Sequence, residues 1–450
     1  MANFNLALLL KQQKEFTFAQ KISYVWQLSL PGIFAQISSI IMQYIDAAMV
    51  GRLGANAPAA IGLVASSTWV LGGLTSAMCT GYTVQVAHAV GAGNKNLAKH
   101  ILCGSIFIGL IFSLALALLG LAISFPLPLW LGASKELCGD ASFYFLIFAL
   151  STPLYMLVYL MSGMLQCSGN MKVPGFMNVL MCILDVVFNA LFIFGMNLGV
   201  KGAALGSAAS ALVTAALIFY FTLYKSDYLN LRGFRDSNVF DLPLCKSAVR
   251  IAMPVAVEKV AFTGALVAVT KIIAPLGAVA LASNSFAVTA ESLCYMPGYG
   301  IGEAATTLTG QATGGKRKDL VRSFSWMTVL FGMIVMAVMG VIMYFICPAV
   351  FSLLTPIKEV QALSAKVLRA ELFAEPLYGA SIVCSGALRG MGDTLVPGIM
   401  NLFSVWIVRL SLSFLLISNL GLTGIWIAMA VELCFRGLIF LTRLLVMTRK

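Results

Sequence analysis

Apolar segments about as long as a transmembrane helix recur along this entire sequence, and that pattern narrows the folds open to the chain. A helix of about twenty residues is long enough to cross the hydrocarbon core of a bilayer. Only 10% of the 450 residues are charged and 60% are hydrophobic, whereas a soluble domain has about 25% charged residues. The segments are too long and too evenly apolar for the alternating strands of a membrane barrel. The sequence therefore predicts an all-α polytopic membrane protein.

Glycine and proline residues separate the apolar sequence into twelve predicted transmembrane spans. No cleavable signal pattern precedes the first span. The ten cysteines lie mostly within the spans and form no CxxC pair, so we expect them to be small core residues, without a disulfide or metal framework. The predicted spans are residues 24–50, 58–83, 101–125, 140–165, 173–197, 200–224, 249–274, 278–305, 323–347, 363–387, 395–418 and 421–444.

The first and seventh spans show that one unit is repeated. The stretch from Pro31 to Gly54 has a counterpart from Pro254 to Gly277, and both ends are offset by 254 − 31 = 277 − 54 = 223 residues. Later in the chain the offset becomes 222, because Asn197-Leu198-Gly199 matches Asn419-Leu420-Gly421. Six spans in each half is an even number, so both halves share one orientation. The sequence thus predicts two six-helix lobes related by a pseudo-twofold axis along the membrane normal, with a cavity between them.

A polar segment between the halves is the predicted domain boundary. The domains we predict are an N-terminal lobe at 1–224, a cytoplasmic linker at 225–248 and a C-terminal lobe at 249–450.

Lysine and arginine residues gather in alternate loops, and this asymmetry predicts the orientation. The poorer set of loops holds Arg52, Lys135, Lys201 and Lys358, with Lys366 and Arg369 at the edge of a span. We expect the richer set to be cytoplasmic, with both termini inside a bacterial-type plasma membrane. This distribution explains the net charge of +12 without a nucleic-acid partner. The richer set is Lys11, Lys14, Lys21, Lys95, Lys99, Lys172, Lys225, Arg232, Arg235, Lys246, Arg250, Lys316, Arg317, Lys318, Arg322, Arg389, Arg443, Arg449 and Lys450.

Two carboxyl side chains lie deep in the predicted spans of the first half. Asp46 is in the first span, and Asp185 is in the fifth with Asn189 one turn later. Residues four apart share a helix face, so Asp185 and Asn189 can present oxygen atoms to one point. Acids within a membrane are costly and usually functional. We expect Asp46, Asp185 and Asn189 to form an oxygen-lined site for a hard cation or a proton, with Asp46 and Asp185 as the metal ligands if the cation is Na⁺; the alternative is a structural hydrogen-bonded group.

The second half carries more charged residues within its spans. We expect Glu258 and Glu375 to line the cavity, and Glu432 to pair with Arg436 one turn away.

Four further charged side chains of the second half have predicted surroundings. Glu371 and Arg369 are expected near the membrane interface in contact with solvent, whereas Lys271 and Arg409 are expected to be internal counter-ions.

Motifs for ATP hydrolysis or membrane-embedded catalysis are missing from the sequence. It contains no GxxxxGK[ST], no DDxxD and no HExxH motif. We therefore expect no cofactor, and any transport should be driven by an ion gradient or be passive.

Four segments resemble the multidrug and toxic-compound extrusion (MATE) family over essentially the full length of the chain. They are IDAAMVGRLG at 45–54, APLGAVALASNSFAV at 274–288, YMPGYGIGEAATTLTGQATGGKRKDL at 295–320 and GALRGMGDTLVP at 386–397. The resemblance implies twelve spans in two lobes. It also implies a transporter that exchanges sodium ions or protons for amphipathic, often cationic, compounds.

Individual residues match positions that the family uses. Asp46 matches the coupling aspartate of the first helix, and Pro31 matches a proline associated in one branch with bending of that helix. Tyr144, Asn189 and Ser207 fall where relatives have polar site residues in the first lobe.

The sequence departs from the family pattern in two ways, in the fifth helix and at the acids of the second lobe. Many relatives have Asn and then Asp in the fifth helix, whereas this chain has Asp185 and then Asn189. In the branch that binds its ion in the second lobe, the two acids correspond to Phe262 and Tyr378 here. Tyr378 thus joins Glu258 and Glu375 as a candidate cavity residue of the second lobe.

Two other functions remain open at this point. One is a flippase for lipid-linked precursors from the same superfamily, for which fourteen spans and a strongly basic cavity would be typical. The other is a membrane-embedded enzyme. We expect a monomer surrounded by lipid, with small amphipathic molecules as substrates.

Overall fold

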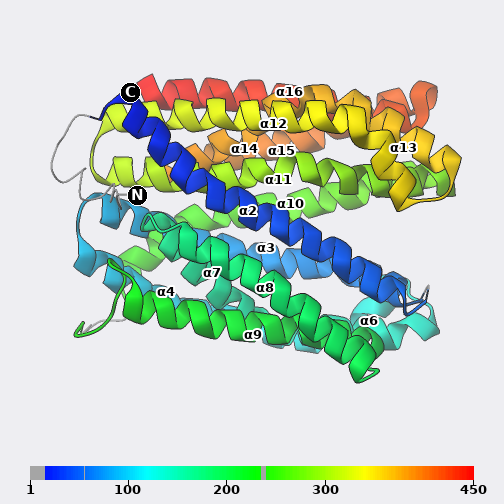
Figure 1. The fold of residues 1–450 in the computed structure, drawn as a ribbon, viewed down its shortest axis with the longest axis horizontal. Helices are drawn as coiled ribbons and strands as arrows, with labels where there is room; N and C mark the ends of the chain where they lie inside the picture. Colours follow the sequence, from blue (N-terminus) through cyan, green and yellow to red (C-terminus); the bar gives the residue numbers. More distant parts are fainter. Residues whose placement is uncertain (1–15, 55, 235–239, 450) are drawn as a thin grey trace. The chain divides into compact units, whose positions relative to one another are not determined.

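The structure, a computed structural model, describes residues 16–54, 56–234 and 240–449. Lys11, Lys14, Arg235 and Lys450, which contributed to the orientation prediction, lie outside these residues. Every regular element in the described part of the chain is helical (Figure 1). The predicted all-α class is therefore confirmed.

The helices fall into two consecutive series. The first series is α2 (Phe18–Gly51), α3 (Asn56–Gly91), α4 (Lys95–Ile123), α5 (Pro126–Trp130), α6 (Lys135–Leu150), α7 (Thr152–Cys167), α8 (Lys172–Ala190), the π-helical η1 (Leu191–Gly195) and α9 (Gly199–Lys225). The second series is α10 (Leu242–Ile273), the 3₁₀ turn η2 (Ala274–Leu276), α11 (Ala278–Gly314), α12 (Lys318–Leu354), α13 (Lys358–Glu371), the 3₁₀ turn η3 (Leu372–Ala374), α14 (Glu375–Gly390), α15 (Leu395–Phe403), the π-helical η4 (Ser404–Arg409) and α16 (Leu410–Arg449).

Hydropathy alone recognises fewer than twelve spans in this structure. Eight described helices are long and apolar enough to cross a membrane, and α6 with α7, bent by 45°, forms a ninth span. The continuous stretch Leu395–Arg449 has 55 residues, about 80 Å of helix, and it breaks at Gly421, where φ is 55°. It therefore supplies two spans, and the more polar α11 and α13–α14 supply the remaining two. This arrangement gives the twelve predicted spans.

Two compact units make up the described chain. The first unit lies within Ser38–Val260, and the second lies within Gln12–Ile37 and Ala261–Lys450. Both α2 and α10 therefore pass from one unit to the other, and the two crossing points are equivalent in the repeat, since 37 + 223 = 260. The predicted domain boundary at 225–248 concerns the sequence repeat, and it stays a prediction.

Each unit has its own apolar core. In the first unit, Met156, Leu160 and Met164 of α7 are fully buried against residues of α3 and α4. In the second unit, Phe351 of α12 and Trp426 of α16 are buried in one cluster. All ten cysteines are free and six of them are buried, which agrees with their predicted role as core residues.

Candidate ion-coupling site

Three helices of the first unit bring the predicted polar residues together. Asp46 lies in the second half of α2, and Asp185 and Asn189 lie on one face of α8. Ser39 of α2 accepts a hydrogen bond from Asn178 Nδ2 of α8 at 2.9 Å, which fixes the two helices against each other. The helix becomes π-helical at Leu191, two residues after Asn189. Short π-helical segments of this kind are frequent at functional sites.

Asn189 joins the two carboxyl groups through its side-chain amide. Its Nδ2 atom donates to Asp46 Oδ1 at 3.0 Å and to Asp185 Oδ2 at 2.9 Å. Ser210 Oγ of α9 donates to Asp185 Oδ1 at 3.2 Å. The structure thus gathers Asp46, Asp185 and Asn189 at one place, and α9 closes the site on a third side.

Burial makes this arrangement costly unless its charge is compensated. Asp185 and Asn189 are only 1% and 2% exposed, and Asp46 is half-buried. Asn189 Oδ1 is buried without a hydrogen-bond partner among the described residues. A Cβ atom on Gly206 would collide with this amide group, so the glycine leaves the space that Asn189 occupies. The site therefore offers oxygen atoms of two carboxyl groups and one amide.

The other two predicted residues lie beside this cluster. Tyr144 of α6 is close enough to Asp46 and Asp185 to interact with them electrostatically. Ser207 of α9 lies within hydrogen-bond reach of Asp185, and its carbonyl oxygen accepts from Ser210 Oγ at 2.9 Å. Sequence reasoning missed Ser210, although its spacing of three residues from Ser207 places it on the same helix face.

In the part of the chain that the structure describes, no basic residue neutralises the two acids. Within the described ranges, neither Asp46 nor Asp185 forms an ion pair with Lys, Arg or His. The described residues also include no group of three or more His, Cys, Asp or Glu side chains that could hold a metal ion. Two uncompensated carboxylates cannot stay bare so close together in a medium of low dielectric constant. The geometry is suited to sharing a proton, or to holding a monovalent cation with help from neutral oxygen atoms.

Pro31 lies in an uninterrupted α2, on the part that belongs to the second unit. Next to it, the backbone of Gly32 touches that of Gly300 in α11, so closely that a Cβ atom on either glycine would collide with the other helix. Bending of α2 at Pro31 stays a prediction.

The three candidate residues of the second lobe do not share one compact unit. Glu375 and Tyr378 are buried on α14 in the second unit. Glu258 is half-buried on the part of α10 that belongs to the first unit. A cavity lined by all three stays a prediction.

Glu432 and Arg436 form the predicted local pair. Arg436 Nε lies 3.1 Å from Glu432 Oε1, and both side chains are buried. Ser404 Oγ of η4 donates to the same Oε1 atom, and the guanidinium group lies over the ring of Tyr378 at 5.2 Å. This pair is internally neutral and locked by its neighbours.

Two expectations for the second half were wrong. Glu371 is fully buried and has no solvent contact, because the end of α13 packs into the apolar core of the second unit with Leu368 and Leu372. Lys271 is exposed, so it is no internal counter-ion, whereas Arg409 is buried and its Nη2 atom contacts Met429 Sδ at 2.7 Å.

The buried polar group around Asp185 in the first half differs in charge from the Glu432–Arg436 pair in the second half. Ser210 and Glu432 are equivalent positions, since 210 + 222 = 432. The acid of this helix pair lies on α8 in the first half and on α16 in the second. In the second half Arg436 compensates the acid, whereas among the described residues of the first half no cation does so. The first group is therefore the better candidate for binding an ion.

Comparison with known proteins agrees with the repeat. A family model described as MatE matches residues 31–191 and, a second time, residues 254–415. The two matches begin at Pro31 and Pro254, the prolines that define the offset of 223 residues.

Similar proteins cover nearly the whole chain. The "Probable multidrug resistance protein NorM" of Thermotoga maritima is 25% identical over 420 residues, which are 91% of this chain and 89% of that protein. A solved structure called "MATE in the straight conformation" has a TM-score of 0.89 at 20% identity and covers 96% of this chain and 97% of its own. One called "MATE in the bent conformation" has a TM-score of 0.85 at 20% identity, with coverages of 97% and 100%. These structures share the fold.

Because the family model covers most of the sequence, once in each half, this chain belongs to the MatE family, the multidrug and toxic-compound extrusion family that its motifs resemble.

Proposed function

We propose that this protein is a secondary antiporter of the plasma membrane that exports amphipathic, often cationic, compounds in exchange for H⁺ or Na⁺. Membership of the MatE family and the similarity to a probable multidrug resistance protein support the efflux function. The observation that carries the ion coupling is the Asn189 amide, which joins two carboxyl groups from different helices that have no basic partner among the described residues.

In the proposed mechanism, the negative charge of the Asp46 and Asp185 carboxylates must be compensated. A proton or Na⁺ bound between Asp46 and Asp185 would cancel one of their two negative charges, with Asn189 Oδ1 as a further oxygen atom for Na⁺. Binding of the ion and of a cationic substrate would alternate as the two lobes move between inward-open and outward-open states. A ligand shifts such an equilibrium only by its difference in affinity for the two states.

The topology and assembly belong to the same proposal. Both termini would be cytoplasmic, as the basic loops indicate. The protein would act as a monomer surrounded by lipid, with no cofactor.

Transport in proteoliposomes with imposed gradients tests the proposal. We expect the purified protein to move a fluorescent organic cation against its gradient when either a proton or a sodium gradient is imposed across the membrane. Dissipating the effective gradient should stop the movement at once. If neither gradient drives transport but a labelled lipid-linked precursor is translocated, the protein is a flippase and the proposal is wrong.

A further inference from the structure

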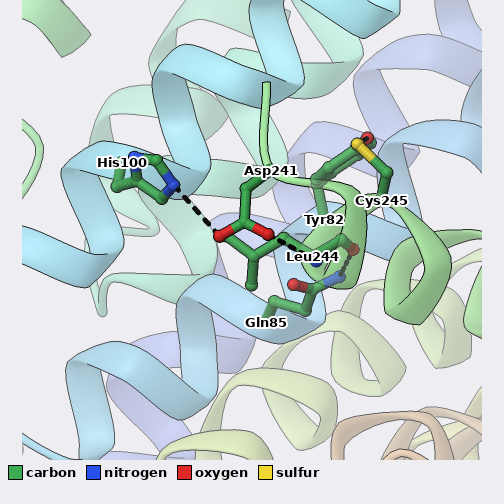
Figure 2. Close-up of polar contacts among 6 residues, drawn as sticks. All are labelled: Tyr82, Gln85, His100, Asp241, Leu244 and Cys245. Carbon is green, nitrogen blue, oxygen red and sulfur yellow. Dashed lines mark hydrogen bonds and ion pairs between the residues drawn. The ribbon is translucent and has the colours of Figure 1, made fainter. Parts of the chain in front are cut away.

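A group of polar contacts outside the candidate site fixes the beginning of α10 (Figure 2). Asp241 precedes the helix, and its Oδ1 atom accepts from the backbone N–H of Leu244 at 3.3 Å, as a helix cap does. The other oxygen of the same carboxyl group lies 3.4 Å from His100 Nε2 of α4. One carboxylate thus caps α10 and ties it to α4.

Two contacts with α3 complete the group. Gln85 Nε2 donates to the carbonyl oxygen of Leu244 at 3.2 Å, and Tyr82 OH donates to Cys245 Sγ at 3.5 Å. Figure 2 shows these side chains converging on the first turn of α10. We call the His100–Asp241 pair the latch.

The latch and the packing beneath it differ in how easily they can open. Ala248 of α10 is 2% exposed and touches α3 so closely that a Cβ atom on Gly81 would collide with its carbonyl group. By contrast, the side chains of His100 and Asp241 are 20% and 35% exposed. Partly exposed polar groups exchange their contacts for water at little cost. The latch is therefore the part of this contact that solution conditions can adjust.

The repeat contains a second contact at the equivalent place. His100 corresponds to Ser323 and Leu244 to Lys21, since 100 + 223 = 323 and 21 + 223 = 244. Lys21 Nζ of α2 donates to Ser323 Oγ of α12 at 3.1 Å. In both halves, the start of a helix that crosses between units is tied to the start of a third-span helix. Only the contact at His100 contains histidine.

Helix α10 runs through both units, so a latch at its beginning can resist movement of one unit against the other. Residues 242–260 of this helix belong to the first unit and residues 261–273 to the second. Any relative displacement of the units must be taken up along the helix or at its docked beginning. A latch that holds this beginning on α3 and α4 resists the second route.

We propose that His100 and Asp241 are a pH-dependent positioning pair that sets how firmly the start of α10 is held, and thereby the rate of the conformational step. This inference rests on the proposed transport function. Histidine normally changes its charge between pH 5 and 8. An imidazolium attracts the Asp241 carboxylate 3.4 Å away more strongly than a neutral imidazole does, so the charged form of the pair is the stronger latch.

The neighbouring charged and titratable groups do not replace His100 in this role. Lys95 and Lys99 on the same helix lie over the rings of Tyr228 and Phe234, 4.8 Å and 5.7 Å from their centroids. From the other packed elements, Tyr82 of α3 and Cys245 of α10 face each other. Asp241 is therefore the charge paired with His100.

Labelling of Cys245 in the full chain in lipid nanodiscs tests the latch directly. A thiol reagent and mass spectrometry would give the rate of alkylation at Cys245 from pH 6 to pH 8. The variants are His100→Gln, which cannot be charged, His100→Lys, which stays charged, and Asp241→Asn, which keeps an N-cap but loses the carboxylate. Comparing proteins at the same pH cancels the effect of pH on the thiol itself.

The unmodified protein should label like His100→Lys at pH 6 and like His100→Gln at pH 8. The two variants should differ by about two- to fivefold, which is the size expected for a partly exposed ion pair. Asp241→Asn should label fast at every pH, whereas Ser323→Ala, the matched change in the other half, should follow the unmodified protein. Equal rates for the unmodified protein and His100→Gln from pH 6 to pH 8 would overturn the latch.

Efflux measurements separate this inference from the proposed function. At pH 8, His100→Lys should export more slowly than the unmodified protein, whereas at pH 6 the two should match. Unchanged efflux beside a confirmed labelling difference would overturn the effect on rate. If the unmodified protein shows no gradient-driven efflux at all, the proposed function fails, whereas the labelling result still decides the latch.

Discussion

A single amide group holds the two carboxyl groups of the candidate site together. Asn189 uses both hydrogens of its Nδ2 atom, one for Asp46 and one for Asp185. A carboxylate here would add a third negative charge, and an apolar side chain would remove the donor that the two acids share and leave Asp185 with Ser210 Oγ. The amide therefore permits the site to gain or lose one ion without losing its geometry.

The carboxyl group of Asp46 should be essential for coupling. Asp46→Asn keeps the shape and a hydrogen-bonding amide but removes the charge, so gradient-driven efflux should fall to the level of empty liposomes. Membrane insertion should be unimpaired, because a neutral residue is cheaper to insert. The measurement is efflux at equal expression.

Glu258→Gln is the matched comparison for Asp46→Asn. This half-buried acid lies outside the hydrogen-bonded cluster, so its loss should reduce efflux much less. Full efflux in Asp46→Asn and none in Glu258→Gln would move the coupling site to the other acid.

Gly206 should be intolerant of even one methyl group. A Cβ atom would meet the Asn189 side chain, and overpacking of this kind costs about 1–3 kcal/mol. Gly206→Ala should lower the melting temperature and reduce efflux together. Gly62→Ala, where the space is open, should do neither; equal melting temperatures for both variants would show that Asn189 can move aside.

Sequence reasoning found the acids of the site but not the residues that hold them. Asp46 and Asp185 stand out because they are solitary charges in apolar helices. Ser210 and Gly206 lie in a helix full of small residues, where nothing in the sequence distinguishes them. Glu371 was misplaced because its neighbours Arg369 and Lys366 suggested an interface, whereas packing of α13 buries its last turn.

At the scale of the helix, α16 carries a buried ion pair that should respond as a unit. Removing one partner of such a pair leaves an uncompensated charge and costs about 3–5 kcal/mol. Glu432→Gln and Arg436→Gln should therefore each lower thermal stability strongly. The double variant Glu432→Leu with Arg436→Met should lose less than either single change, as measured by thermal unfolding in detergent.

Asp185→Asn provides the contrast to this pair. No described cation would be left without a partner, so this change should cost little stability although it abolishes coupling. Additive losses in the double variant of α16, or strong unfolding of Asp185→Asn, would contradict the assignment of a structural role to one group and a coupling role to the other.

Hydropathy predicts a membrane-spanning helix reliably where the segment is apolar on all sides. In α11 and α14 the buried faces carry Glu291, Glu375 and several threonines and glycines, which lower the hydropathy although these faces do not meet lipid. Both spans were among the twelve that glycine and proline residues delimit in the sequence. The π-helical segments η1 and η4 could not be predicted, because they depend on packing between helices and not on residue type.

At the scale of the whole molecule, α2 and α10 pass from one compact unit to the other at equivalent positions of the sequence repeat. The chain changes units after Ile37 and again after Val260, each six residues past a repeat proline, since 37 − 31 = 260 − 254 = 6. A proline within a helix removes one backbone hydrogen bond and makes that turn easier to bend. Both crossings therefore lie six residues past the turn that each proline weakens.

Topology reporters test the orientation on which the proposed direction of transport depends. Twelve spans predict that both ends of the chain lie on one side of the membrane, and the basic loops predict that this side is the cytoplasm. A reporter fused after Lys450 and another inserted between residues 235 and 239 should both be cytoplasmic, because six spans separate the two points. One fused after Arg52, which follows a single span, should be external. If the first two reporters lie on opposite sides, the second half has an odd number of spans, and the pseudo-twofold relation along the membrane normal is wrong.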